Sequence, residues 1–98
     1  MMDLARFKQS VATAAPPQDL SQAIAALWWD AKGDWHKAHE CAQAQADPIG
    51  AWVHAYLHRK EGDQSNAGYW YRRAGKPPAT VSLAEEWDAI ATTLLAAT

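Results

Sequence analysis

The chain has 98 residues, 49% of them hydrophobic, and a formal net charge of -2 at pH 7. This length gives room for one hydrophobic core, and the near balance of charge gives no basic field that would attract nucleic acid. No apolar run approaches the roughly 20 residues of a membrane-spanning helix. With Cys41 as its single cysteine, the chain needs no oxidising compartment for an internal disulfide. We therefore expect a cytoplasmic protein whose partners include neither nucleic acid nor a membrane.

The first boundary along the chain is Pro16-Pro17, because proline disfavours the continuation of a helix. Residues 1–18 are therefore expected to form an N-terminal segment of their own. Leu4, Phe7 and Val11 have the spacing of one helical face, but an isolated helix of this length is marginally stable in water. We expect a short helix or partial disorder in this segment.

Capping signals predict a pair of helices in residues 19–46. Asp19, followed three residues later by Gln22, is a capping-box pattern, so the first helix should begin there. Gly33-Asp34 ends that helix and starts the next, since glycine suits a left-handed helix C-terminus and aspartate caps a helix N-terminus. The second helix should continue to about residue 46.

The same signals return in residues 47–75. Asp47-Pro48 is a capping carboxylate followed by proline at the first helical position, where the missing N–H has no cost. Gly62-Asp63 repeats the stop-and-cap pattern of the first pair, and the helix that follows should end at Gly75. These residues are therefore expected to form a second helical hairpin.

A last helix is predicted over residues 82–97. Ser82 and Glu85 form another capping box, and nothing in the chain alternates convincingly with the two-residue period of a strand. We therefore predict an all-α protein of five main helices, arranged as two antiparallel hairpins and a C-terminal capping helix. This capping helix should cover the open end of the second hairpin with an apolar stripe at helical spacing, formed by Leu83, Trp87, Ile90 and Leu94.

The two hairpins align with one another as an internal repeat. Placing Gly33-Asp34 on Gly62-Asp63 puts Ala38 on Ala67, at a spacing of 29 residues. This pattern resembles the tetratricopeptide repeat, whose second helix commonly opens with Gly-Asp and has a packing alanine five residues after the glycine. Residues 69–74 are similar to the Sel-like subclass. The resemblance implies hairpins stacked in a right-handed superhelix within a single domain spanning residues 19–98.

The first copy departs from the family pattern, and the repeat is shorter than usual. Ala42 stands where the family has an aromatic residue and Gln45 where it has a small one. The spacing also falls short of the usual 34 residues. The whole chain also resembles a small family of bacterial proteins, but this resemblance implies no activity.

The resemblance implies a concave groove lined by the first helix of each hairpin. Its floor would be Leu27, Trp52 and Tyr56, and its edges Asp30 and Arg59. Large aromatic side chains beside a charge suit a protein or peptide partner. The same residues could instead be covered by the chain itself or by a second copy in a homodimer. The leading hypothesis is a non-enzymatic protein–protein interaction module that needs no cofactor.

Four histidines give an alternative hypothesis. His36 and His39 are three residues apart on the second predicted helix, and His54 and His58 are four apart on the third, so each pair can share a face. If these helices are antiparallel, His39 lies level with His54 and His36 nearly level with His58, with Glu40 nearby. Such a group could bind zinc or another divalent metal. However, His36 and Glu40 point toward the polar side of their helix, and His54 and His58 fall on packing positions of the repeat.

Overall fold

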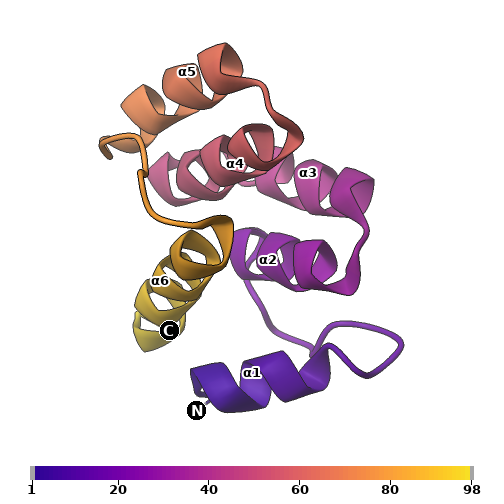
Figure 1. Ribbon diagram of the computed structural model, residues 1–98. Helices are drawn as coiled ribbons and strands as arrows, with labels where there is room; N and C mark the ends of the chain where they lie inside the picture. Colours follow the sequence, from indigo (N-terminus) through magenta and orange to yellow (C-terminus); the bar gives the residue numbers. More distant parts are fainter. Residues whose placement is uncertain (1, 98) are drawn as a thin grey trace.

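A computed structural model describes residues 2–97 of the chain. These residues form six helices and no strand, so the prediction of an all-α protein is confirmed. The helix beyond the five main ones predicted comes from the N-terminal segment. None of the described helices is long and apolar enough to cross a membrane. In chain order they are α1 (Leu4–Ser10), α2 (Gln22–Lys32), α3 (Trp35–Ala44), α4 (Pro48–Glu61), α5 (Gln64–Ala74) and α6 (Leu83–Ala96) (Figure 1).

The two Gly-Asp corners have the same local structure. Gly33-Asp34 and Gly62-Asp63 place their glycines at φ 94° and 93°, in the left-handed region that glycine enters without steric cost. Each aspartate side chain accepts a backbone N–H three residues later, from Lys37 at 3.0 Å and from Asn66 at 3.1 Å. Each aspartate N–H also donates to the carbonyl five residues earlier. The chain therefore reverses twice in the same way, giving the hairpins α2–α3 and α4–α5.

Helix α2 begins later than predicted. Its N-cap is Ser21, whose side-chain oxygen accepts the N–H of Ile24 at 3.2 Å. The predicted capping box of Asp19 and Gln22 is therefore wrong. Asp19 lies at φ 67°, a left-handed conformation from which a right-handed helix does not start and which aspartate tolerates better than most residues.

The turn between α3 and α4 is organised by Gln45, which ends α3 two residues earlier than predicted. Its side-chain oxygen accepts the N–H of Ala23 at 2.8 Å, and its amide nitrogen lies 3.2 Å from both carboxylate oxygens of Asp47, the N-cap of α4. Gly50 faces the same residue so closely that a Cβ there would lie 1.8 Å from the Gln45 carbonyl oxygen. This turn fixes how the start of α4 lies relative to α2 and α3.

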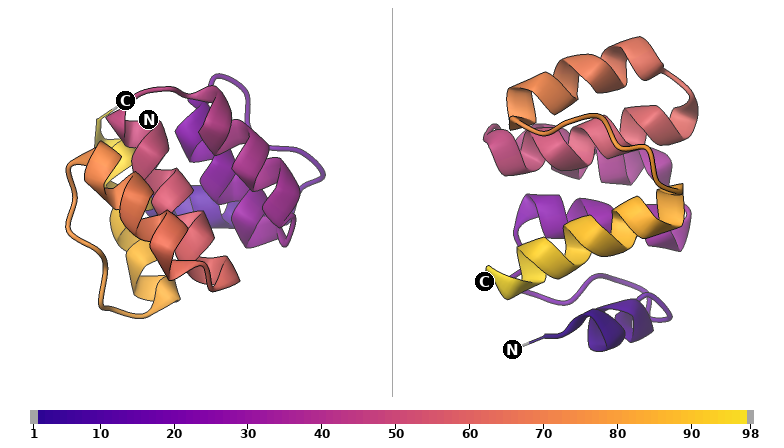
Figure 2. Two further views of the ribbon diagram at one scale, coloured as in Figure 1. Left: turned by 90° about the horizontal axis from the view of Figure 1, so that it is seen from above. Right: turned by 60° about the vertical axis from the view of Figure 1, so that its left-hand side comes forward.

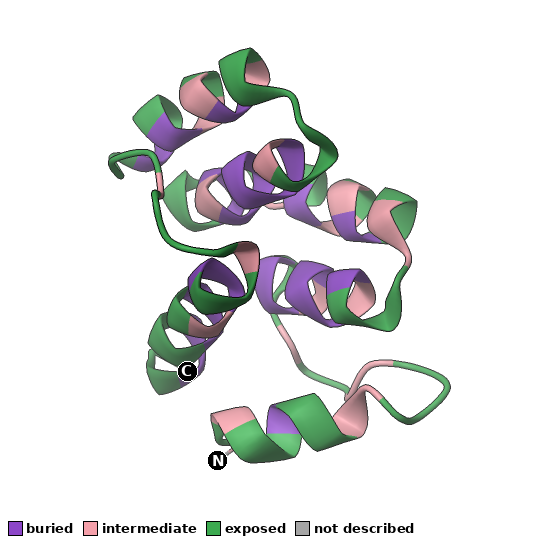
Figure 3. Cartoon of the chain, viewed as in Figure 1, coloured by how far each residue is buried: buried purple, intermediate pink, exposed green. Residues whose placement is uncertain are grey.

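Helix α4 lies at the centre of the fold. It packs against α5 in its own hairpin and against both α2 and α3 of the first hairpin. Figure 2 shows the hairpins stacked, with α1 at the far end of the molecule from α5. Both sides of α4 are therefore buried along most of its length, as Figure 3 shows.

The sequence predicts that the apolar stripe of α6 covers the open end of the second hairpin. Helix α6 contacts this hairpin through α4, and it contacts α5 through the hydrogen bond from Tyr71 to Glu86. It packs against α1, α2 and α4. Trp87 donates its indole N–H to the carbonyl of Leu27 at 3.0 Å and stacks on Phe7 with 5.7 Å between ring centroids. On α5, the side chains of Arg72 and Arg73 are exposed, so covering them would gain little hydrophobic free energy. The stripe instead completes the main core between the first hairpin and α1.

The N-terminal segment is docked on the rest of the chain. Phe7 of α1 is fully buried, and Trp28 of α2 donates its indole N–H to the hydroxyl of Ser10 at 3.0 Å. Lys32 donates to the carbonyl of Val11 at 2.8 Å. Core packing and these hydrogen bonds therefore stabilise a helix that would be marginal in isolation.

Candidate functional site

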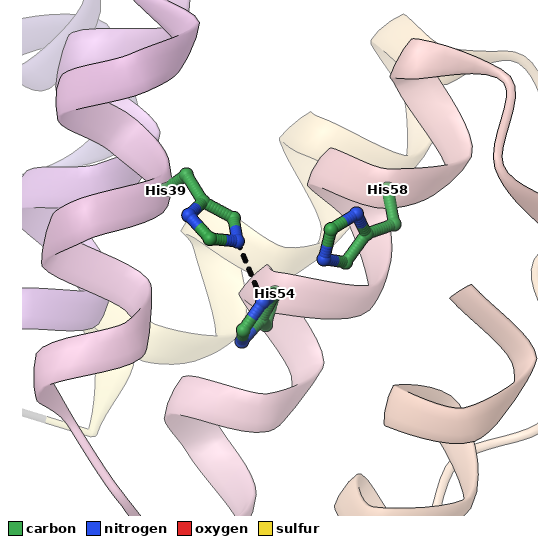
Figure 4. Close-up of side chains that lie close together, drawn as sticks. All are labelled: His39, His54 and His58. Atoms are coloured by element: carbon green, nitrogen blue, oxygen red, sulfur yellow. Dashed lines mark hydrogen bonds between the residues drawn. The ribbon is translucent and has the colours of Figure 1, made fainter. Parts of the chain in front are cut away.

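Three of the four histidines lie together between α3 and α4. His39 comes from α3, while His54 and His58 come from successive turns of α4 (Figure 4). The Nε2 atoms of His39 and His54 are 2.9 Å apart, and one ring nitrogen from each of the three residues lies within 4.8 Å of the other two. The antiparallel arrangement therefore places His39 level with His54. We call these three residues the histidine cluster.

Two tryptophans enclose the histidine cluster. Trp35 stacks on His39 with 5.0 Å between ring centroids, and Trp70 of α5 stacks on His54 at 3.9 Å. The indole N–H of Trp35 donates to the carbonyl of Leu57 at 2.9 Å, which fixes that ring against α4. His54 and His58 are only 4% and 6% exposed. These two rings are therefore shielded from water, whereas His39 is half-buried.

Burial disfavours the charged forms of His39 and His54. It lowers the pKa of His54 to about 4, with further contributions from the neighbouring rings of His39 and His58. Burial, followed by the nearby His58 ring, also lowers the pKa of His39. Both imidazoles are therefore neutral at pH 7, so one can donate a hydrogen bond to the other across the 2.9 Å gap. A neutral imidazole is also the form that binds metal ions.

Glu61 contacts the outer side of the cluster. Its Oε2 atom lies 2.5 Å from Nδ1 of His58, and the side-chain amide of Asn66 lies 3.4 Å from Nε2 of the same ring. A carboxylate on one nitrogen of a histidine fixes the tautomer and the orientation of the ring. In Figure 4, the other nitrogen of His58 is turned toward His39 and His54.

The structure does not bring His36 and Glu40 into this cluster. Both side chains are exposed on α3. His36 makes an edge contact with Trp35 at 5.6 Å between ring centroids. The expected alignment of His36 with His58 does not occur, since Trp35 and His39 are the residues of α3 that contact His58.

The predicted concave groove is largely occupied by α6. Leu27, Asp30 and Tyr56 are buried, and Leu27 lies beneath Trp87. An open cleft of about 430 Å³ remains between α1, α2, α4 and α6. We call it the α6 cleft; it is lined by Lys8, Val11, Asp30, Ala31, Tyr56, Lys60, Leu83, Ala84, Trp87 and Asp88.

The charged groups of the α6 cleft form ion pairs, but its two lysines still have unused hydrogen-bond donors. Asp30 accepts the hydroxyl of Tyr56 at 2.7 Å and the ammonium of Lys60 at 2.8 Å. Lys8 pairs with Asp88 at 3.0 Å. The lysine side chains are 50% and 40% exposed at positions 8 and 60, and each ammonium has three donors. Donors therefore remain available to a ligand at the rim.

Arg59 and Trp52, the other predicted groove residues, lie outside this cleft. Arg59 pairs with the buried carboxylate of Glu86 at 2.8 Å, and the hydroxyl of Tyr71 donates to the same carboxylate. Trp52 is half-buried, with the ammonium of Lys76 4.3 Å from the centre of its ring. Of the five predicted groove residues, the cleft thus includes Asp30 and Tyr56, while Arg59 helps to position α6.

Sequence reasoning missed Glu61 beside the histidine cluster, and Lys8, Lys60 and Trp87 in the α6 cleft. Glu61 is three residues after His58, a spacing that places two side chains on the same helical face. Lys60 could have been found by the same rule from Tyr56. No local signal indicates Lys8 or Trp87, because the packing of distant segments places them there.

Comparisons of the chain with protein-family models, with curated proteins and with solved structures find no match.

Proposed function

We propose that the chain is a non-enzymatic interaction module of the tetratricopeptide-like kind. Its ligand is a short acidic segment of a partner protein, bound in the α6 cleft through one bulky apolar side chain. The observation that carries this proposal is an open, mostly apolar cleft whose rim has two lysines with unused hydrogen-bond donors.

The local structure supports the repeat part of the proposal. The two hairpins have matching corners, and α4 packs against both helices of the preceding hairpin, as stacked repeats do. Two repeats are fewer than the roughly three that ordinarily bury a continuous core. The packing of α1 and α6 on the first hairpin compensates for the missing unit, and it leaves the α6 cleft where a longer array would have an open groove.

The walls of the cleft favour an apolar anchor. Trp87, Tyr56 and Leu83 are among the apolar side chains that line it, and its volume of about 430 Å³ lies in the range of small-molecule sites. A single aromatic or branched aliphatic side chain would displace water from this surface, which is the main favourable term in such binding. The cleft is therefore suited to one anchoring residue of a peptide.

The rim favours an acidic peptide. The carboxylate of Asp30 is already occupied by Tyr56 and Lys60, so it offers little to a ligand. Lys8 and Lys60 can each donate further hydrogen bonds without losing their present partners. Carboxylates flanking the anchor would accept these hydrogen bonds, and charge-assisted bonds of this kind are stronger than neutral ones.

A titration of isotope-labelled protein with designed peptides, followed by nuclear magnetic resonance, tests the proposal. The probe is a hexapeptide with a central phenylalanine flanked by glutamates. One control replaces the phenylalanine by serine, and a second replaces the glutamates by lysines. We expect shifts confined to the cleft residues and a Kd on the order of 0.1 mM for the probe. Both controls should bind at least ~10-fold more weakly, because each loses one of the two favourable terms.

Matched variants of α6 locate the binding surface. Ala84 is exposed and lines the cleft, whereas Ala89 is exposed on the same helix outside it. Ala84→Glu should abolish binding of the probe, and Ala89→Glu should leave it unchanged. Equal effects of the two substitutions would contradict the proposal. So would a dimer, measured by light scattering, that dissociates only in Ala84→Glu, because the cleft would then belong to a second copy of the chain.

A further inference from the structure

The histidine cluster suggests a second ligand, unrelated to peptide binding. Three imidazoles from two adjacent helices present nitrogens within 4.8 Å of one another. Neutral imidazole is a good ligand for zinc and the neighbouring transition metals. We propose that His39, His54 and His58 bind a divalent transition-metal ion, and that Zn²⁺ is the ion their geometry suits best.

The distances are close to those of a three-histidine metal site. Two nitrogens bound to one tetrahedral Zn²⁺ at about 2.0–2.1 Å lie roughly 3.3 Å apart. The Nε2 atoms of His39 and His54 are 2.9 Å apart in the present hydrogen bond, so these rings need to separate only slightly. The third nitrogen lies within 4.8 Å of both. A metal ion would replace the proton shared between two of the rings.

The surroundings of the cluster resemble the outer shell of a metal site. Metal-binding histidines commonly contact a carboxylate through the ring nitrogen that does not bind the ion. Glu61 makes this contact with Nδ1 of His58 at 2.5 Å. Trp35 and Trp70 stack on the other two rings and restrict their rotation. The ligands are thus oriented before an ion arrives.

A pocket borders the histidine cluster at His54. This pocket of about 260 Å³ lies beside the turn between α3 and α4, and His54 and Trp70 form part of its wall. Its other lining residues include Asp47 and Arg73. Three protein ligands leave the fourth tetrahedral position open for water or a small ligand. The pocket offers space for such a group next to His54.

Metal titrations of the untagged, chelator-treated protein test the proposal. We expect Zn²⁺ to bind with a stoichiometry of one, measured by calorimetry, and Co²⁺ to give the visible absorption of a tetrahedral nitrogen-ligated ion. His39→Phe preserves an aromatic ring against Trp35 but removes both nitrogens. His36→Phe is the matched control, since it changes an exposed histidine on the same helix outside the cluster. His39→Phe should lower the Zn²⁺ affinity about 100-fold or more and His36→Phe should not, because affinity depends on the full ligand set.

Glu61→Gln tests the positioning role of the carboxylate. It should weaken Zn²⁺ binding by about 10-fold or more, the effect seen when such an outer contact is lost. The unfolding midpoint of the metal-free variant should remain close to that of the unchanged chain, because Glu61 is exposed. Weaker Zn²⁺ binding with an unchanged unfolding midpoint would indicate that Glu61 positions a ligand. A lower midpoint in the metal-free protein would indicate a purely structural role.

Three results would overturn the metal site. The first is the absence of stoichiometric Zn²⁺ binding at micromolar concentration, and the second is binding that His39→Phe leaves unchanged. The third concerns His58, Glu61 and Asp63, which also have ligand atoms within 4.8 Å of one another. If Asp63→Asn removes binding and His39→Phe does not, the ion lies at the corner between α4 and α5. Asparagine preserves the helix cap at position 63, so this variant is expected to fold.

Discussion

The two sides of α4 differ in how their candidate sites are built. Residues two apart on a helix point about 200° away from each other. His54 and His58 therefore face α3 and α5, whereas Tyr56 and Lys60 face the α6 cleft. The histidine cluster is assembled from two helices joined by one short turn. The α6 cleft needs α1 and α6, which come from opposite ends of the chain.

This difference shows which contacts depend on local structure and which depend on the packing of distant segments. The hydrogen bond between Trp87 and Leu27 joins residues 60 positions apart, whereas His39 and His54 are 15 positions apart. Substitutions that release α6 should therefore destroy the cleft but preserve the hairpins.

Trp87→Ala should be the most damaging change on the α6 side. The side chain is 6% exposed, stacks on Phe7 and donates to the carbonyl of Leu27. Its removal should lower the free energy of unfolding by about 4 kcal/mol, the usual cost of deleting a large buried aromatic. Urea unfolding followed by circular dichroism measures the loss. Trp70→Ala is the comparison on the other side of α4, and its smaller buried surface should give a loss near 2 kcal/mol. Equal losses of unfolding free energy in Trp87→Ala and Trp70→Ala would contradict this difference between the two sides of α4.

Glu86→Ala should be the next most damaging change. Its buried carboxylate accepts hydrogen bonds from Arg59 and Tyr71 and so joins α6 to α4 and α5. Removing it leaves a guanidinium and a hydroxyl without their acceptor, at a cost of about 3 kcal/mol. The neighbouring Glu85 is exposed and serves as the control. Glu85→Ala should cost less than about 1 kcal/mol by the same urea measurement, since it affects only the cap at Ser82.

Much of the fold was predictable because its signals are local. The Gly33-Asp34 and Gly62-Asp63 corners and the Asp47-Pro48 start each depend on the conformational preferences of adjacent residues. The contact between His39 and His54 follows from helical spacing and one antiparallel turn. The prediction fails at the start of α2, where two possible N-caps compete. Ser21, two residues after Asp19, caps the helix in place of Asp19.

The position of α6 could not be predicted from such signals. Its apolar stripe showed that Trp87 and Ile90 would be buried, but not which surface would bury them. The outcome depends on the total apolar area gained over several distant segments. The α6 cleft therefore combines two predicted groove residues, Asp30 and Tyr56, with side chains that no nearby pattern indicates. Glu61 was missed for another reason: its spacing from His58 is also that of an ordinary solvent-exposed pair.

High pH should weaken the α6 side through two buried tyrosines. Burial, and then the hydrogen bond to Asp30, raises the pKa of Tyr56; burial and the hydrogen bond to Glu86 do the same for Tyr71. A raised folded-state pKa means that the stabilisation is complete below the unfolded pKa of about 10 and is lost as the pH rises above it. At pH 11 each tyrosine should reduce the free energy of unfolding by about 1.4 kcal/mol.

Tyr56→Phe isolates one of these contributions. Urea unfolding at pH 9 and pH 11 should show a pH-dependent loss that is about 1.4 kcal/mol smaller in Tyr56→Phe than in the unchanged chain. The substitution also removes a donor to Asp30, so its absolute stability at pH 9 should be lower. An unchanged pH-dependent loss would show that Tyr56 ionises equally in both states, contrary to its buried position.

The smallest expected effect is the coupling between the two candidate sites. They lie on opposite sides of α4 and share none of the contacts described above, and independent sites of this kind usually add within about 0.3–0.5 kcal/mol. His39→Phe should therefore leave the affinity for the acidic peptide unchanged, and Ala84→Glu should leave Zn²⁺ binding unchanged. Measuring both ligands with each single variant and with the double variant tests this. A larger coupling would mean that α4 shifts as a rigid body when one site is filled, since it is the one helix that contributes residues to both.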